Sequence, residues 1–509
     1  MNAPVNAPLS ATASGRPAAP IAPPVTDRLV SLTWLPPVLA AAAVVLLVAV
    51  PFPGSVLLCA SGAIGIIAAL SPSWAVALLA GSLALNNVGA WDAGGTTVTI
   101  PYALTIAVVV GWGLRVLAFR EPLRPSPIVW PLAAYLLVTL LSRIVAVDPQ
   151  AWVNEVQVWA NGLVILVVAT QAIRTRAQVW RIVGIMAGCV IALTAYALWQ
   201  VATDQGPPSY EVGGLLRAFA TFGGPNSLAK YLEMTVPLLA ALSGAWLVAV
   251  TPWLRDRVPV VARTIPWWVG LLATVATAAG GLAMALTQSR GGWIGIALGL
   301  AVVALLLGGV YRWTFIIATF AIVLLAILTP VGDRVALRFG SEALGISTSS
   351  TPVNVTPANW AVQERLAHYQ AGLHMAREHP WLGVGAGNFD ARYREYTEVW
   401  RFRIPRSHAH NAYIQVAAQT GLAGLGAYLA LIVTVAVRLR TRWRTTTGSA
   451  RIIVIGAVGV SVAVATHNLF DYLHVGVLPI QLSLVWAIAE RVRLDHGKPA
   501  DSGQEKVSA

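Results

Sequence analysis

Charged side chains are scarce in this sequence. They make up 11% of its 509 residues, whereas hydrophobic residues make up 57% and the mean hydropathy is +0.69. A soluble domain carries about 25% charged residues, so this composition excludes a soluble globular protein. The apolar residues gather in runs of about 17–25, the length that a helix needs to cross a bilayer. The sequence therefore predicts an all-α integral membrane protein with about 12–14 transmembrane helices and one large extracytoplasmic loop that contains short helices.

Lysine and cysteine are also rare. Lysine occurs only as Lys230, Lys498 and Lys506, so the net charge of +13 comes almost entirely from arginine, which is dispersed among short loops. Nucleic-acid binding needs a basic patch or stripe instead, so we expect no nucleic-acid partner. Cys59 and Cys189 both lie inside apolar runs, and no disulfide framework is expected.

Hydropathy divides the chain into five segments. We expect a disordered tail at 1–27, a transmembrane bundle at 28–330, the large loop at 331–410, C-terminal transmembrane helices at 411–491 and a cytoplasmic tail at 492–509. The candidate spans are 34–50, 54–70, 73–89, 100–118, 127–146, 157–173, 180–202, 227–250, 266–287, 292–309, 313–329, 411–437, 451–470 and 475–491.

The large loop has a mixed composition. Residues 341–358 are rich in Ser and Thr and are expected to form a linker. Residues 360–378 place apolar side chains at helical spacing and predict an amphipathic helix. The stretch "HPWLGVGAGNF" that follows contains a proline and three glycines, and it predicts a turn against the membrane face. It is not expected to bind a nucleotide, because no strand precedes it and no Gly-Lys-Ser/Thr follows.

Arginine is distributed unevenly between the short loops. With the N-terminus in the cytoplasm, the loops on that side hold residues such as Arg120, Arg174 and Arg440, whereas the opposite loops hold acids such as Asp148. Positive loops favour the cytoplasmic side, so the 331–410 loop should face outward. The abundance of Arg, Ala, Gly and Pro is typical of a GC-rich bacterial genome. We therefore expect the bacterial inner membrane, with a site on its periplasmic or extracellular side.

Two arginines depart from that charge rule. Arg217 and Arg290 fall in short loops on the expected outer side, where they either reach lipid headgroups or bind an anion. A guanidinium stays charged and matches phosphate oxygens bidentately. Asn226 lies in a Gly-Gly-Pro-Asn turn that opens a helix at about 227, and Gln288 precedes Arg290 and two glycines. Such turns and helix starts offer backbone N–H groups to an anion.

Histidines gather on the same expected face. Seven of the eight lie in outer segments or at that interface; they are His368, His374, His379, His408, His410, His467 and His474. Neutral imidazole is a good proton acceptor near pH 7. His408 and His410 share a side if the chain approaches the membrane extended, and Asn411 is a natural N-cap for the span that follows.

His467 and Asp471 are four residues apart, so on one helix they would share a face. Asp471 either orients His467 or only caps the outer end of the span. The set of His408, His410, His467 and Asp471 would also supply enough ligands for a metal. No cysteine or second carboxylate is close in sequence, and we expect neither a metal nor a cofactor.

A succession of motifs over residues 210–475 resembles a known superfamily. An arginine precedes "FGGPNSLAKYL", and "TQSRGGWIG", "HPWLGVGAGNF" and "SHAHNAYIQVAAQTGLAGLGAYL" follow in that order. This order is similar to the O-antigen ligase/O-antigen polymerase superfamily of bacterial membrane glycosyltransferases. The resemblance is strongest at 379–426, and the N-terminal spans share only the hydropathy of the superfamily.

The resemblance implies an inverting, metal-independent glycosyl transfer in polysaccharide biosynthesis, such as lipopolysaccharide assembly. The donor would be a glycan on polyprenyl (typically undecaprenyl) pyrophosphate, and the acceptor a glycan, a lipid or a protein, all among membrane lipids. By motif match, Arg217 and Arg290 would contact the pyrophosphate, and His410 would activate the acceptor hydroxyl, with His408 in reserve. We expect the 360–378 helix to carry Arg365 toward the donor.

Two other functions are weighed against this one. A membrane transporter of a small anion is the main alternative, because some relatives have been labelled bicarbonate transporters. A conduction path should leave ionisable groups at mid-membrane depth, whereas here they concentrate at one face, with Lys230 and Glu233 near the start of a span. A scaffold or receptor is the third possibility, and nothing in the sequence supports it.

Overall fold

The computed structural model describes residues 54–88, 91–92, 97–212, 214–251, 264–314, 316–317, 355–356, 359–398, 400–404 and 408–492. The predicted tails, the predicted span at 34–50, most of the span at 313–329 and most of the Ser/Thr-rich linker lie outside these residues. The chain divides into two compact units at residues 1–59 and 60–509. Apart from the first residues of one helix, everything described below belongs to the second unit.

The described residues form a helical bundle with almost no sheet. The helices are α3 (Gly54–Leu70), α4 (Pro72–Ser82), α5 (Ile100–Phe119), α6 (Val129–Leu141), α7 (Pro149–Ala172), α8 (Arg176–Ala202), α9 (Pro225–Glu233), α10 (Val236–Val250), α12 (Trp267–Thr287), α13 (Arg290–Leu307), α16 (Trp360–Glu378), α17 (Phe389–Tyr396), α18 (Ala412–Thr445), α19 (Gly448–His467) and α20 (Leu478–Arg491). Two short antiparallel pairs join β1 (Trp91–Asp92) to β2 (Thr97–Val98) and β3 (Glu211–Val212) to β4 (Leu215–Leu216).

The predicted all-α membrane architecture is confirmed. Within the described residues, seven helices are long and apolar enough to cross a membrane, and a bent pair makes an eighth. Each predicted span that falls in the described residues coincides with a helix, but α3, α4, α6 and α20 are shorter than a full span. Among the described residues, fewer helices are long enough to span than the predicted spans that fall there.

The span predicted at 227–250 is broken. Helix α9 ends at Glu233, and α10 begins at Val236 with a bend of 44° between them. Pro237 is the second residue of α10, and a proline at that position leaves the preceding turn without one backbone donor. The break places the polar residues Lys230 and Glu233 of α9 inside the bundle, where both are buried.

The bundle core depends on close helix approach. Helices α13 and α19 pack along most of their length, and the backbones meet where Gly299 faces Gly459. A Cβ at Gly299 would lie 2.6 Å from the carbonyl oxygen of Gly459. Small residues at such crossings let backbones approach, which is how helices gain contact in a lipid environment that offers little hydrophobic drive.

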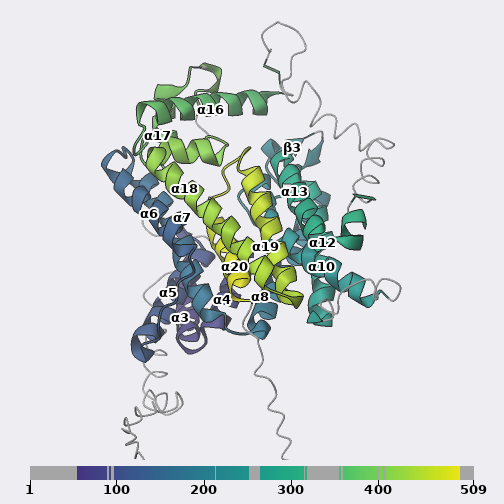
Figure 1. The fold of residues 1–509 in the computed structure, drawn as a ribbon. Coiled ribbons are helices and arrows are strands. Elements are labelled where there is room, and N and C mark those ends of the chain that lie inside the picture. The colour runs from purple at the N-terminus through teal and green to yellow at the C-terminus, as the bar shows by residue number, and fades with distance from the viewer. Residues whose placement is uncertain are drawn as a thin grey trace, which may run out of the picture. The chain divides into compact units, whose positions relative to one another are not determined.

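Helices α16 and α17 lie over one end of α18 (Figure 1), here called the cap end. The predicted amphipathic helix at 360–378 is confirmed with the same bounds as α16. The glycine-rich segment after it forms the predicted turn, and Gly387 adopts a φ of +73° where a Cβ would meet the backbone of Ala151. On α18, Gly421 adopts a φ of +63° and meets the backbone of Trp381. The cap is thus packed into the bundle.

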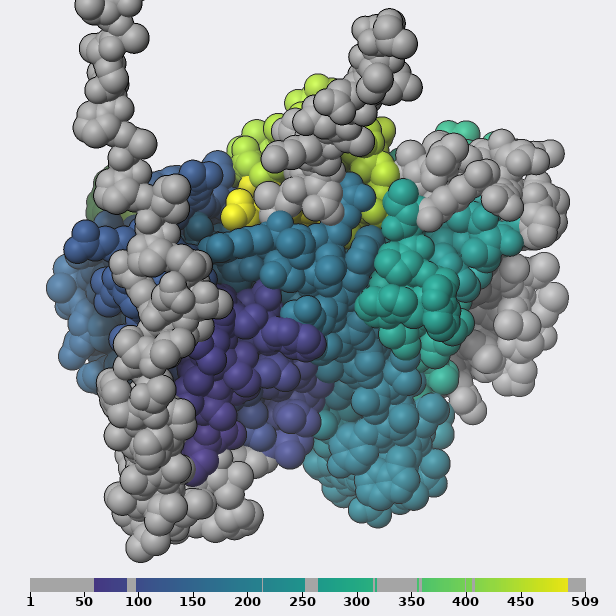
Figure 2. Space-filling model, turned by 90° about the horizontal axis from the view of Figure 1, so that it is seen from below, coloured from purple at the N-terminus to yellow at the C-terminus, as the bar shows by residue number. Residues whose placement is uncertain are grey.

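The other end of the bundle, here called the arginine end, carries paired charges. Arg438 and Arg442 of α18 bind Glu490 of α20 at 2.8 and 3.3 Å, and Arg115 and Arg174 bind Glu121 at 2.8 and 2.6 Å. Figure 2 shows the second unit from this side, where purple residues of α4 lie beside the blue and teal residues of α5, α7 and α8.

Candidate active site

The short segment 408–411 enters the bundle at the cap end. The Asn411 side chain accepts hydrogen bonds from the backbone N–H groups of Tyr413 and Ile414 at 2.9 and 3.0 Å, so the predicted N-cap of α18 is confirmed. His410 adopts a φ of +54°, an uncommon backbone for a residue with a Cβ. The Tyr369 hydroxyl of α16 donates to the His410 carbonyl at 3.1 Å and helps to hold it there.

The rings of His408 and His410 share a side, as predicted, with their centroids 4.4 Å apart. The left-handed backbone at His410, rather than an extended strand, brings them together. His408 Nε2 and His410 Nδ1 each lie 3.6 Å from the same oxygen, Oδ1 of Asp471, whose side chain is only 2% exposed. Two partly exposed histidines and a buried carboxylate, about 60 residues apart in sequence, therefore meet in one cluster.

Lys230 of α9 completes this cluster. Its ammonium donates to the Tyr472 carbonyl at 2.7 Å and lies 3.4 Å from Oδ2 of Asp471. Oδ1 of Asp471 also accepts the backbone N–H of Tyr472 at 2.8 Å. Oδ2 of the carboxylate thus faces Lys230, and Oδ1 faces the two histidines.

Electrostatics fix the charge state of the cluster. Burial alone raises the pKa of Asp471, but the Lys230 ammonium and the facing histidines outweigh burial and hold that pKa well below its usual range. Burial lowers the pKa of His408 well below its ordinary value, and the charges of His410, Lys230 and Arg365 lower it further against the opposing effect of Asp471. At neutral pH the carboxylate is therefore ionised and His408 is uncharged.

The two histidines differ in their free nitrogens. His408 Nδ1 accepts the backbone N–H of His410 at 3.2 Å, so both of its ring nitrogens are engaged. His410 turns Nδ1 toward Asp471, and no hydrogen-bond partner from the described residues reaches its Nε2. A carboxylate behind one ring nitrogen and an open second nitrogen is the arrangement of a general base.

His467 does not pair with Asp471 through its side chain, which excludes the first of the two predicted roles of that acid. Helix α19 ends at His467, and Asp471 lies in the following loop, where its backbone N–H donates to the His467 carbonyl at 2.9 Å. His467 Nδ1 instead binds Glu233 at 2.8 Å in a pair that is almost fully buried. A Cβ at Gly291 would collide with the His467 ring, so this pair supports the start of α13.

The two predicted pyrophosphate-binding arginines lie at the cap end. Arg217 donates to the Thr287 carbonyl and to the Asn226 side chain, both at 2.9 Å. Arg290 is the first residue of α13 and follows Gln288, whose φ of +50° ends α12. Asn226 opens α9 one turn before Lys230, so α9 links the arginine turn to the histidine cluster.

Arg365 of α16 contributes charge to the same region. Its guanidinium lowers the pKa of His408, and no acidic partner among the described residues binds it. The other outer histidines are placed differently. His368 stacks on Tyr393 and lies edge-on to His410 at 5.5 Å, whereas His374 and His379 face Glu398 and Tyr396 away from the cluster.

A metal is a geometric possibility at the cluster. One ligand atom from each of His408, His410 and Asp471 lies within 4.8 Å of the others. The Lys230 ammonium at 3.4 Å from Asp471 already supplies a positive charge there, and a divalent cation would be repelled by it. The predicted fourth ligand, His467, pairs with Glu233.

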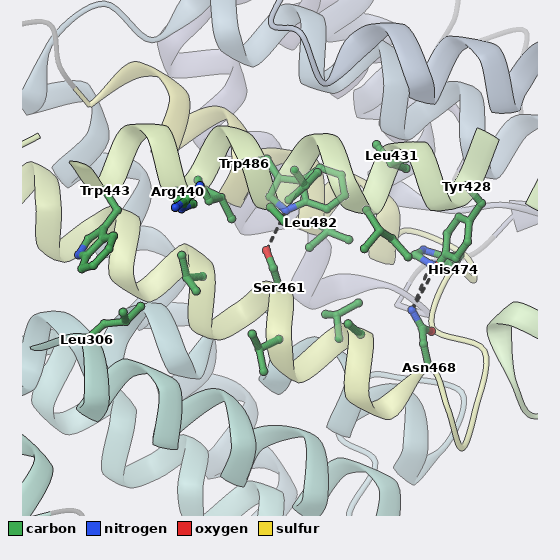
Figure 3. A pocket seen from close by; sticks show the side chains of 18 residues that line it. Leu306, Tyr428, Leu431, Arg440, Trp443, Ser461, Asn468, His474, Leu482 and Trp486 are labelled. Carbon is green, nitrogen blue, oxygen red and sulfur yellow. Dashed lines mark hydrogen bonds between the residues drawn. The ribbon is translucent and has the colours of Figure 1, made fainter. Parts of the chain in front are cut away.

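An apolar cavity of about 400 Å³ lies between α18, α19 and α20. One end is polar, because the Tyr428 hydroxyl is 2.7 Å from His474 Nε2 and Asn468 donates to that hydroxyl at 3.2 Å. The other end is bordered by Arg440 and Trp443 (Figure 3). Leucine, valine and tryptophan side chains line the space between, so the cavity suits a hydrocarbon chain.

Sequence reasoning missed three residues of the site. Lys230 and Glu233 were recognised only as ionisable groups near the start of a span, and Tyr369 was not singled out. One signal for Lys230 was present, since lysine occurs only three times in the chain. No sequence pattern indicates its partner, which is 241 residues away, because helix packing alone brings the two together.

Comparison with known proteins identifies part of the chain. Residues 273–429 match the family model described as O-antigen ligase. The matched stretch runs from α12 into α18 and contains Arg290, Arg365, His408 and His410, whereas Arg217 and Asp471 lie outside it. No curated protein matches the sequence. The expected resemblance to the O-antigen ligase/polymerase superfamily is confirmed.

Proposed function

We propose, on the premise that residues 273–429 match the O-antigen ligase family model, that this multi-pass membrane protein transfers a glycan from a polyprenyl-pyrophosphate donor to an acceptor hydroxyl. The family suggests a glycosyltransferase-like activity, and the acceptor is a growing glycan, a lipid core or a protein. The observation that carries the proposal is the convergence of His408, His410, Asp471 and Lys230 at the cap end.

His410 acts as the general base. With Nδ1 facing Asp471 at 3.6 Å, its Nε2 takes the proton of the acceptor hydroxyl. The oxygen then attacks the anomeric carbon, and the bond to the pyrophosphate breaks with its electron pair on the leaving oxygen. This displacement inverts the anomeric centre. Asp471 stabilises the imidazolium that forms, as an ionised carboxylate does behind a catalytic histidine.

Arg217, Arg290 and Arg365 bind the pyrophosphate. Negative charge grows on the leaving oxygen during bond cleavage, so fixed guanidinium groups stabilise the transition state more than the bound donor. Arg217 is already oriented by Thr287 and Asn226. These cations supply the charge that a metal would otherwise provide, and transfer should persist in EDTA.

The apolar cavity takes the hydrocarbon chain of the donor. Asn468, at the polar end of the cavity, is the residue after His467. The His467 ring packs against Gly291, which follows Arg290. A lipid with its pyrophosphate at the arginines would thus lie with its chain beside α19. The site faces the periplasm or the outside, because the arginine end carries the positive loops that favour the cytoplasm.

Transport of a small anion is the alternative, and the break between α9 and α10 favours it, since broken helices line transporter sites. The groups at the break are Glu233 and His467, which bind each other. A buried carboxylate at that depth repels an anion. Proteoliposomes that contain the protein should therefore take up no bicarbonate above the level of empty liposomes.

The function is tested with purified protein in nanodiscs, a polyprenyl-pyrophosphate glycan and each candidate acceptor. His410→Ala should lower the transfer rate by about 10²–10⁴-fold, while the variant accumulates and elutes as the parent does. His408→Ala should lower the transfer rate less, because both ring nitrogens of His408 already face other groups of the chain and neither can take the proton of the acceptor. Normal transfer by His410→Ala would remove it as the base, and a larger loss in His408→Ala would exchange their roles.

A further inference from the structure

Lys230 is an unusual residue in an unusual place. Three of the 34 basic residues in the chain are lysines, and Lys230 alone of these falls in the described residues. Its side chain is 4% exposed, and its two partners, Asp471 and the Tyr472 carbonyl, come from the loop between α19 and α20. A chain whose basic residues are nearly all arginine thus has a buried lysine beside the Asp471 carboxylate.

A buried ammonium is costly unless it is paired. Removing an ion from water costs several kcal/mol even after relaxation, so a lysine persists there only where contacts offset that cost. Lysine concentrates its charge in a compact head, whereas arginine spreads it over a planar fork that would need both carboxylate oxygens. With lysine on Oδ2, the other oxygen of Asp471 remains for His408 and His410.

The charges that face this cluster come from every element around it. They are Lys230 and Glu233 of α9, Arg365 and Tyr369 of α16, His408 and His410 before α18, His467 of α19, and Asp471, Tyr472 and His474 of the loop before α20. Glu233 is matched to His467. Lys230 and Asp471 are therefore the charged pair that faces His408 and His410.

We propose that Lys230 is a positioning residue: by binding Oδ2 of Asp471 and the Tyr472 carbonyl, it keeps Oδ1 directed at His408 and His410. This rests on the function proposed above. The charge of Lys230 also opposes protonation of His408, against the opposite effect of Asp471. As His410 takes the proton from the acceptor, the departing pyrophosphate becomes more negative nearby, and the new imidazolium is then favoured.

The test measures histidine titration and needs no substrate. The full chain with ¹³C-labelled histidine is placed in nanodiscs, and the resonances are assigned with His408→Gln and His410→Gln. Lys230→Met should raise the pKa of His408, because the charge of Lys230 lowers it. Asp471→Asn should move it in the opposite direction, and the double variant should return it toward the parent value.

Matched controls separate charge from structure. Lys230→Gln keeps a donor for the Tyr472 carbonyl but removes the charge, and it should titrate as Lys230→Met does. Arg444→Met removes one positive charge from an exposed position at the arginine end, and it should leave the titration unchanged. If neither Lys230 variant folds, the double variant remains readable, because it removes both members of the buried pair.

Two outcomes overturn the proposal. The first is an unchanged titration in folded Lys230→Met, and the second is a shift in the same direction in Lys230→Met and Asp471→Asn, as simple loosening of the site would produce. The transfer assay distinguishes this failure from failure of the proposed function. If the titration shifts in Lys230→Met but the parent protein transfers no glycan, only the proposed function is refuted. If Lys230→Met transfers glycan normally at all pH values, only the role of Lys230 is refuted.

Discussion

The two ends of the bundle use ionisable residues differently. At the arginine end, Glu490 and Glu121 each bind two arginines in side-chain pairs that belong to the chain itself. At the cap end, one carboxylate is divided among a lysine and two histidines, and Arg365 is bound by no acid among the described residues. Closed pairs hold helices together, whereas a charge that is bound by no acid of the described residues can bind a ligand.

The largest expected difference concerns arginine geometry. Arg217→Lys or Arg290→Lys should lower kcat/KM for the donor by about tenfold or more, because a point charge cannot bind two phosphate oxygens as a fork does. Arg438→Lys, the same change at the arginine end, should leave transfer within about twofold. Initial transfer rates in nanodiscs are measured for the three variants. Equal losses at both ends would show that the arginines of the cap end bind no phosphate.

Removing a closed pair should affect stability rather than activity. Glu490→Gln leaves Arg438 and Arg442 without their carboxylate, and we expect a loss of about 2 kcal/mol in unfolding free energy, since the glutamate is 3% exposed. The thermal midpoint in detergent reports this loss. Transfer per folded molecule should be unchanged, and Arg444→Met, at an exposed position, should leave the midpoint near that of the parent.

Acid should weaken the cap end through His474. Burial and the charge of Lys230 lower its pKa to about 3, so the unfolded chain binds a proton below about pH 6.5 that the folded chain refuses. Stability is therefore complete above that pH and falls as pH decreases, by about 1.4 kcal/mol per unit for this group. Midpoints measured from pH 7 to pH 5 should fall less steeply in His474→Gln, and an equal slope would contradict the assignment.

The smallest expected effect concerns the cavity. Val458→Trp should fill part of it and raise KM about fivefold for a donor with a long polyprenyl chain, because the displaced hydrocarbon loses its apolar contacts. A donor analogue with a short prenyl chain should be unaffected. Val433→Trp on the exposed side of α18 (Val433 is 60% exposed) is the matched control. Equal effects on both donors would exclude the cavity as the chain site.

Much of the fold follows from the sequence, because hydropathy and helical spacing are local properties. The bounds of α16 and the N-cap at Asn411 were predicted correctly for that reason. Of the two roles predicted for Asp471, orienting His467 is excluded, because His467 binds Glu233 of a helix far away in sequence, which no local spacing indicates. The Lys230 and Asp471 pair was not predicted, since it depends on how α9 packs against a distant loop.

The contact between Gly421 and Trp381 has a mechanical consequence. Since not even a methyl group fits between the kink of α18 and the turn after α16, the cap cannot swing away from the membrane as a hinged lid while this joint remains closed. Any displacement of the cap must tilt α18, a helix of 34 residues and about 50 Å that binds Glu490 through Arg438 near its other end. Substrates should therefore enter from the side of the bundle rather than from beneath a rising cover.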